Sequence, residues 1–189
     1  DIICRDDPSR PRILILNYPS NPTGCTYTDD QLLAIANIAR KYRLILLSDE
    51  IYGEVHFEGR HKSIARYYPE GTIISTGLSK WAGAGGWRLG TFIFPRELRP
   101  LQDAMAIIAS ETYTATSAPI QHAAIAAFNG GDDIDEYLKQ SRRVLKVVGE
   151  YMHRRLSDMG AVVQKPEGAF YLFPDFSGFR EQLASKDIK

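Results

Sequence analysis

Three short apolar runs recur along the first half of this 189-residue chain, and each is followed at once by polar residues and a turn. The runs occupy residues 12–18, 44–47 and 72–76. Continuous apolar runs of this length are typical of strands buried on both faces, as in parallel sheets covered by helices. The pattern therefore predicts an α/β fold with a mostly parallel sheet, in which the first strand is buried on both faces.

A helix is expected between the first two runs. Thr28 and Gln31 have the spacing of a capping box, and apolar residues then recur at helical spacing as far as Ala39. Strand, helix and strand within about 35 residues form a βαβ unit. Further along the chain we expect a strand at 91–94, helices at 96–109, 118–128 and 134–159, and a final strand at 169–173.

A change in composition near Asp132, just after two glycines, predicts a domain boundary. Residues 1–131 are expected to form an incomplete large domain, and residues 132–189 the start of a small α+β domain. The chain opens with Asp1 rather than methionine and ends in a charged stretch. We therefore interpret it as a piece of a longer polypeptide.

Charge, apolar runs and cysteine spacing give no support for several classes of function. Lys and Arg together number 23, as do Asp and Glu, so the formal net charge is zero and gives no support for a nucleic-acid or anionic-membrane partner. No apolar run approaches the roughly 20 residues that a membrane-spanning helix needs. Cys4 and Cys25 lack the spacing of a zinc site or a disulfide scaffold. A cytoplasmic location is expected, with a removed targeting peptide as the open alternative.

Chemically distinctive residues follow the predicted strands. Asn21 follows the first apolar run, Asp49 and Tyr52 follow the second, and Lys80 follows the third. Ligands of open α/β sheets bind beyond the carboxyl ends of the strands. We therefore expect these four side chains to share one site.

The segment around Lys80, GLSKWAGAGGWRLG, indicates a particular cofactor. A lysine amine can act as a covalent catalyst on a carbonyl group. Arg88, eight residues further on, is a planar cation suited to a phosphate, and the hydroxyl of Ser79 could assist it. An aldehyde and a phosphate occur together in pyridoxal 5′-phosphate, so this segment predicts that cofactor.

The other candidates have roles in the same chemistry. Lys80 would form a Schiff base with the cofactor and then move a proton at the substrate Cα. Asp49 would keep the pyridine nitrogen protonated, and Asn21 and Tyr52 would donate hydrogen bonds to the phenolic oxygen. Each residue alone also has a simpler interpretation: Asn21 in a turn, Asp49 as a helix cap, Tyr52 in the core. Their shared position after successive strands favours the functional interpretation.

The chain resembles the class I/II pyridoxal-phosphate-dependent aminotransferases of the aspartate aminotransferase fold type. Residues 77–90 fit the family signature, and Asn21–Gly24 and Asp49–Tyr52 fall where two further markers fall. Residues 117–121 and 168–171 continue the match. The resemblance implies a three-layer αβα large domain and a homodimer with active sites at the subunit interface. It also implies a reaction that exchanges an amino group between an amino acid and a 2-oxo acid.

Two departures from the family pattern matter. Many members carry a serine where this chain has Gly77, which removes one hydroxyl from the expected phosphate site. The chain also lacks the family's N-terminal segment for the phosphate and ring, and the C-terminal arginine for the substrate carboxylate; Arg180 is not assigned that role. These missing segments leave a non-catalytic fragment as one open alternative. A carbon–sulfur β-lyase or synthase of the same fold type is the other, because it shares the lysine, the aspartate and the arginine.

A metal site is not expected. Glu54, His56 and Glu58 alternate along the sequence, with His61 nearby. This pattern is interpreted as a polar edge strand rather than as a set of metal ligands.

Overall fold

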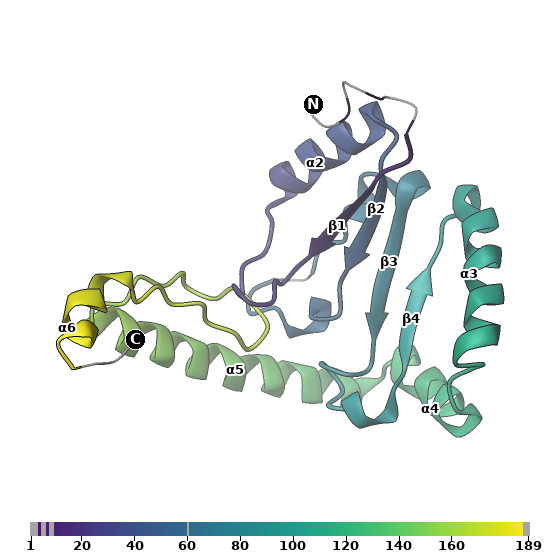
Figure 1. The fold of residues 1–189 in the computed structure, drawn as a ribbon. Helices are drawn as coiled ribbons and strands as arrows, with labels where there is room; N and C mark the ends of the chain where they lie inside the picture. The colour runs from purple at the N-terminus through teal and green to yellow at the C-terminus, as the bar shows by residue number, and fades with distance from the viewer. Residues whose placement is uncertain (1–3, 5–6, 8–9, 60, 187–189) are drawn as a thin grey trace.

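A four-stranded mixed sheet is the centre of the fold in the computed structural model, which describes residues 4, 7, 10–59 and 61–186 (Figure 1). The strands lie in the order β1, β2, β3, β4, with bounds Ile13–Asn17, Ile45–Asp49, Thr72–Gly77 and Gly90–Ile93. β2 pairs in parallel with both β1 and β3, whereas β4 pairs antiparallel with β3. The predicted α/β fold with a mostly parallel sheet is confirmed.

The register of the parallel strands aligns their carboxyl ends. Asn17 of β1 is opposite Asp49 of β2, and Asp49 is opposite Ser75 of β3. Residues that directly follow these three strands therefore begin at one edge of the sheet, as the sequence predicts.

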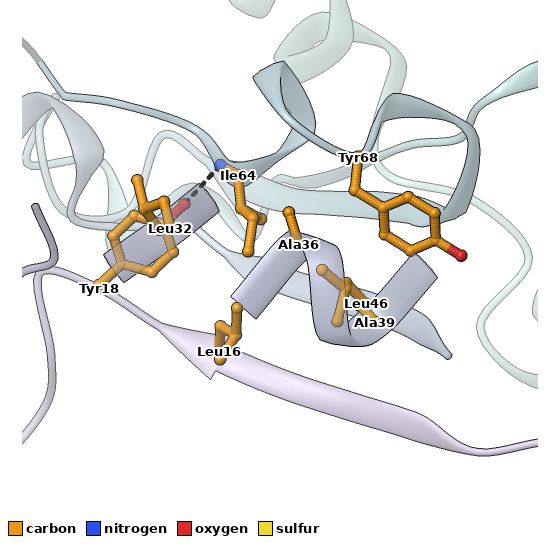
Figure 2. Close-up of a cluster of buried hydrophobic side chains, with 8 residues drawn as sticks. All are labelled: Leu16, Tyr18, Leu32, Ala36, Ala39, Leu46, Ile64 and Tyr68. Atoms are coloured by element: carbon orange, nitrogen blue, oxygen red, sulfur yellow. Dashed lines mark hydrogen bonds between the residues drawn. The ribbon is translucent and has the colours of Figure 1, made fainter. Parts of the chain in front are cut away.

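Helix α2 (Asp29–Lys41) covers one face of β1 and β2 and begins at the predicted capping box. The Thr28 hydroxyl accepts a hydrogen bond from the Gln31 N–H (3.3 Å), and the Gln31 side chain accepts one from the Thr28 N–H (2.9 Å). Figure 2 shows the core that this helix closes, with the hydroxyl of Tyr18 accepting a hydrogen bond from the N–H of Ile64 at 2.7 Å. The residues of this core are Leu16, Tyr18, Leu32, Ala36, Ala39, Leu46, Ile64 and Tyr68.

The prediction that the first strand is buried on both faces is wrong. Leu16 is 7% exposed, but Ile13 and Ile15, which point to the opposite face, are 60% and 63% exposed. The physical reason is that β1 is an edge strand in the described sheet and α2 covers one of its faces. An apolar run in the sequence does not reveal how many of its faces are covered.

The predicted helices after β4 are present with small shifts of their ends. They are α3 (Arg99–Thr112), α4 (Ala118–Asn129) and α5 (Asp132–Asp158). A fourth, short helix, α6 (Arg180–Ala184), is one that the sequence pattern did not predict. Short 3-10 turns occupy Gly53–Val55, Ile64–Arg66, Pro69–Gly71, Gly85–Trp87, Arg96–Leu98 and Ser177–Phe179. In Figure 1, α3 lies beside β4, and α5 passes the end of the sheet and extends beyond it. None of the helices in the described ranges has the length and apolarity required to cross a membrane.

A second core joins the turn after β3 to helices α4 and α5. It contains Val55, Leu78, Trp81, Leu89, Ala124 and Leu138. Asp132, the predicted domain boundary, is the first residue of α5, yet Leu138 in the same helix packs into this core. The first turns of α5 therefore pack against residues from before the predicted boundary, and the division into two domains stays a prediction.

The predicted strand at 169–173 is absent, and isolated bridges flank it instead, between His56 and Gly168 and between Val162 and Asp175. Ala169 has a φ of 58°, outside the extended region, and its N–H donates to the Val55 carbonyl at 2.7 Å. This turn prevents the apolar and aromatic residues that follow from continuing as a strand.

The predicted edge strand around Glu54 is also wrong. Gly53–Val55 form a 3-10 turn, and the segment lies against α5. Two ion pairs join them: Glu54 with Arg142 (2.6 Å) and Glu58 with Lys146 (2.9 Å). Both carboxylates therefore bind helix α5 instead of projecting from a sheet edge.

Candidate active site

Lys80 lies in the turn that follows β3. The side chains of Leu78 and Trp81 on either side of it are buried in the second core, whereas Lys80 itself is exposed. Hydrogen bonds from the Gly83 N–H to the Lys80 carbonyl and from the Ala84 N–H to the Leu78 carbonyl, both at 3.3 Å, close the turn. Buried neighbours thus fix the backbone, and the lysine side chain is left to project out of the core.

The amine of Lys80 faces aromatic rings. Its Nζ lies 5.7 Å from the ring centroid of Tyr52 and 6.0 Å from that of Phe170. No carboxylate in the described part of the chain lies within ion-pair distance of it. Contacts with ring faces bind a cation weakly at exposed sites, so this amine is available to a ligand.

The Asp49 carboxylate is held at the end of β2 by two donors. Oδ2 accepts a hydrogen bond from the Asn17 side chain at 3.0 Å, and Oδ1 accepts one from the Ile51 N–H at 3.3 Å. The second bond fits the capping interpretation in part, although Ile51 lies in a turn and a 3-10 helix begins only at Gly53. A carboxylate oxygen can accept more than one hydrogen bond, so Asp49 retains capacity for a ligand.

Asn21 lies in the loop after β1, and its backbone N–H donates to Oδ1 of Asn17 at 2.7 Å. The Gly24 N–H donates to the Ser20 carbonyl at 2.8 Å, so this segment is also the turn that its composition indicates. The Asn21 side chain is exposed. Asn17, which the sequence reasoning did not single out, therefore connects two of the predicted site residues, Asn21 and Asp49.

Tyr52 is buried, and its hydroxyl lies 2.5 Å from the hydroxyl of Tyr171. Burial raises the pKa of Tyr171, and the hydrogen bond with Tyr52 raises it further. Tyr171 was also missed as a site residue, although it lies in the 168–171 segment that matches the family pattern. Its place in that motif was the available signal.

The segment 166–171 closes over the Asn21 loop. The Gly24 carbonyl accepts hydrogen bonds from the N–H groups of Glu167 (2.8 Å) and Gly168 (3.1 Å). Gly24 has a φ of +71°, and a Cβ at this position would lie 2.9 Å from the Tyr171 carbonyl oxygen. The backbone of segment 166–171 lies so close to Gly24 that this position has no room for a side chain.

Arg88 and Ser79 flank the same turn. The guanidinium of Arg88 donates to the Gly85 carbonyl at 2.8 Å. Gly85 lies against Ser79, because a Cβ on Gly85 would be 3.9 Å from the Ser79 Cβ. Arg88 and Ser79 thus both lie close to Gly85, while no hydrogen bond joins Arg88 to Lys80 or Asp49 within the described ranges.

Gly77, at the end of β3, occupies a position with no space for a side chain. A Cβ on Gly77 would lie 2.6 Å from the Leu89 carbonyl oxygen and 3.1 Å from the Gly90 Cα. The backbones of β3 and β4 approach too closely here for any side chain in this conformation.

The donor set fits pyridoxal phosphate. An amine without a carboxylate partner matches an aldehyde, a fixed carboxylate matches a ring nitrogen, and a guanidinium and a hydroxyl on one turn match a phosphate. Asp49 provides the carboxylate at the last position of β2, and Ser79, Lys80 and Arg88 provide the other groups on the segment that follows β3. No group of three or more His, Cys, Asp or Glu residues suited to a metal ion occurs among the residues that the structure covers.

The sequence profile of the family described as aminotransferase class I and II matches residues 3–188. The chain belongs to this family. It is 37% identical over 171 residues to a probable N-acetyl-LL-diaminopimelate aminotransferase of Bacillus subtilis, an alignment that covers 89% of this chain and 41% of that protein. It is 34% identical over 171 residues to the aspartate aminotransferase of Geobacillus stearothermophilus, covering 88% and 42% of the two chains.

Solved structures of aminotransferases have the same fold. The aspartate aminotransferase of Thermus thermophilus with maleate superimposes with a TM-score of 0.83 at 31% identity, covering 89% of this chain and 43% of that one. An alanine aminotransferase from Pyrococcus furiosus gives a TM-score of 0.75 at 36% identity, covering 87% and 42%. The chain therefore spans less than half the length of these relatives.

Proposed function

We propose that the protein carrying this chain is a pyridoxal-phosphate-dependent aminotransferase that exchanges an amino group between an amino acid and a 2-oxo acid. The observation that carries the proposal is the position of Lys80. Its amine has no carboxylate partner in the described ranges and lies beside Tyr52, past the same edge of the sheet at which Asp49 is fixed. Membership of the aminotransferase family supports the same assignment.

When bound, pyridoxal phosphate supplies an aldehyde that combines with amines and a ring that accepts electrons from the substrate Cα. Lys80 is the residue that would hold the aldehyde carbon. With the substrate in place, the Lys80 amine would serve as the base that takes a proton from the substrate Cα. The aromatic rings of Tyr52 and Phe170 lie beside this amine, at 5.7 and 6.0 Å from Nζ to the ring centroids.

The remaining site residues would orient the cofactor ring and anchor its phosphate. Asp49, fixed by two donors, would hold a protonated ring nitrogen. The side chains of Asn21 and Tyr52 would donate to the phenolic oxygen. Arg88 and Ser79, which both lie close to Gly85, would bind the phosphate.

Amino transfer is preferred over the carbon–sulfur lyase reaction because the relatives cited above are named as aminotransferases. Product analysis separates the two reactions. A transaminase returns to its starting form only when a 2-oxo acid accepts the amino group, whereas a β-lyase releases pyruvate and ammonia without one. The homodimer and the cytoplasmic location stay predictions.

The test is reductive labelling of the polypeptide at its natural length. Borohydride treatment with pyridoxal phosphate should attach a pyridoxyl group to the peptide that contains Lys80, as detected by mass spectrometry. Lys80→Arg should abolish the label, and the matched control Lys165→Arg, at an exposed lysine, should retain it. An unlabelled Lys80 peptide in the natural sequence would refute the proposal.

A further inference from the structure

We propose that Asn17 is a positioning residue that sets Asp49 and Asn21 for the cofactor; this inference rests on the proposed function. Asn17 is the last residue of β1 and is directly opposite Asp49 in the parallel pair. Its side chain reaches along the carboxyl edge of the sheet in two directions, to the end of β2 and to the loop after β1.

The amide group of Asn17 has one productive orientation. Its nitrogen donates to the Asp49 carboxylate at 3.0 Å and approaches the Asp49 carbonyl at 3.4 Å, while its oxygen accepts from the Asn21 N–H at 2.7 Å. An ionised carboxylate can only accept and a backbone N–H can only donate. Reversing the amide would set two acceptors together at one end and two donors at the other, so both contacts fix the same orientation.

These contacts require both the chemistry and the length of asparagine. Aspartate would keep the acceptor toward Asn21 but would place a second carboxylate against Asp49. Alanine would remove both contacts. Neither change removes a backbone hydrogen bond between β1 and β2, and the Tyr18 N–H still donates to the Asp49 carbonyl at 3.3 Å. Both variants are therefore expected to fold.

The role differs from simple capping of a loop because it acts on two cofactor contacts at once. Through Asp49, Asn17 affects the hold on the ring nitrogen. Through Asn21, it affects the hold on the phenolic oxygen. A hydrogen bond to a charged group is stronger than one between neutral groups, so the Asp49 contact should have the larger effect.

The experiment compares two cofactor probes on the apoprotein at its natural length. One is pyridoxal phosphate, and the other is its 1-deaza analogue, in which a C–H replaces the ring nitrogen. Dissociation constants are measured by equilibrium dialysis for the natural sequence, for Asn17→Asp and Asn17→Ala, and for the control Asn37→Ala on the exposed face of α2. Borohydride labelling of Lys80 is measured in parallel.

We expect Asn17→Asp to weaken pyridoxal phosphate at least about tenfold and the deaza analogue by less than about twofold. Asn17→Ala should weaken both, with the larger loss for pyridoxal phosphate, and Asn37→Ala should weaken neither. Equal losses for the two probes in Asn17→Asp would indicate a structural role and overturn the inference, as would no loss at all. If Lys80 is labelled in the natural sequence, such a result leaves the proposed function intact; without that label, both proposals fall.

Discussion

Replacing Gly24 by alanine tests whether segment 166–171 closes over the Asn21 loop. A residue other than glycine at a φ of +71° costs about 1 kcal/mol. The new Cβ would also lie 2.9 Å from the Tyr171 carbonyl oxygen and 3.2 Å from the Pro166 Cβ, and overpacking of this kind typically costs about 1–3 kcal/mol. We therefore expect Gly24→Ala to lower the free energy of unfolding by about 2–4 kcal/mol.

Gly59→Ala is the matched control. Gly59 has a φ of +65°, and a Cβ there would meet no atom within 4 Å, so only the backbone cost of about 1 kcal/mol applies. Urea denaturation followed by fluorescence measures both variants, and the difference in midpoint isolates the close approach. If Gly24→Ala costs no more than Gly59→Ala, residues 166–171 do not lie against the loop, and the arrangement of the site is wrong.

Two further predictions concern the core and acid stability. Leu32 is 0% exposed and Leu33 is 44% exposed, so Leu32→Ala should cost about 2–5 kcal/mol in urea denaturation and Leu33→Ala less than about 1 kcal/mol. Burial alone raises the pKa of Glu50, but hydrogen bonds from His61 (2.8 Å) and Ser63 (2.6 Å) outweigh burial and hold it below the usual 4.5. Because the unfolded chain binds this proton more readily, Glu50 stabilises the fold above about pH 4.5 and loses that effect as the pH falls further. Glu50→Gln should therefore show a shallower loss of stability between pH 5 and 3; an unchanged acid profile would contradict the assignment.

The sequence alone located the sheet and the residues at its carboxyl edge because both depend on local patterns. Apolar runs mark the strands, and parallel register aligns their ends, so Asp49 and Lys80 could be placed without coordinates. Exposure of Ile13 could not be predicted in this way. Burial depends on which elements cover each face, and the periodicity of one strand carries no information about its neighbours.

Contacts between segments that are distant in the sequence could not be predicted from it either. Asn17 lies inside an apolar run of the sequence, and only the structure shows its amide between Asp49 and Asn21. Residues 169–173 have the composition of a strand, yet the turn at Ala169 prevents it. β-propensity reflects fit to neighbouring strands, so composition alone could not decide this case.

The hydrogen bond from the Thr26 N–H to the Glu167 carboxylate (2.8 Å) joins residues 141 positions apart, and it helps to hold segment 166–171 over the Asn21 loop. The entropy of closing a loop grows only with the logarithm of its length. An insertion of about 20 residues in an exposed turn, such as the one at Gly130 and Gly131, would therefore add only about 0.1 kcal/mol to the cost of closure. Related chains can thus gain or lose surface segments between these two residues, and diverge in what surrounds the site, with almost no change in the entropy of assembling it.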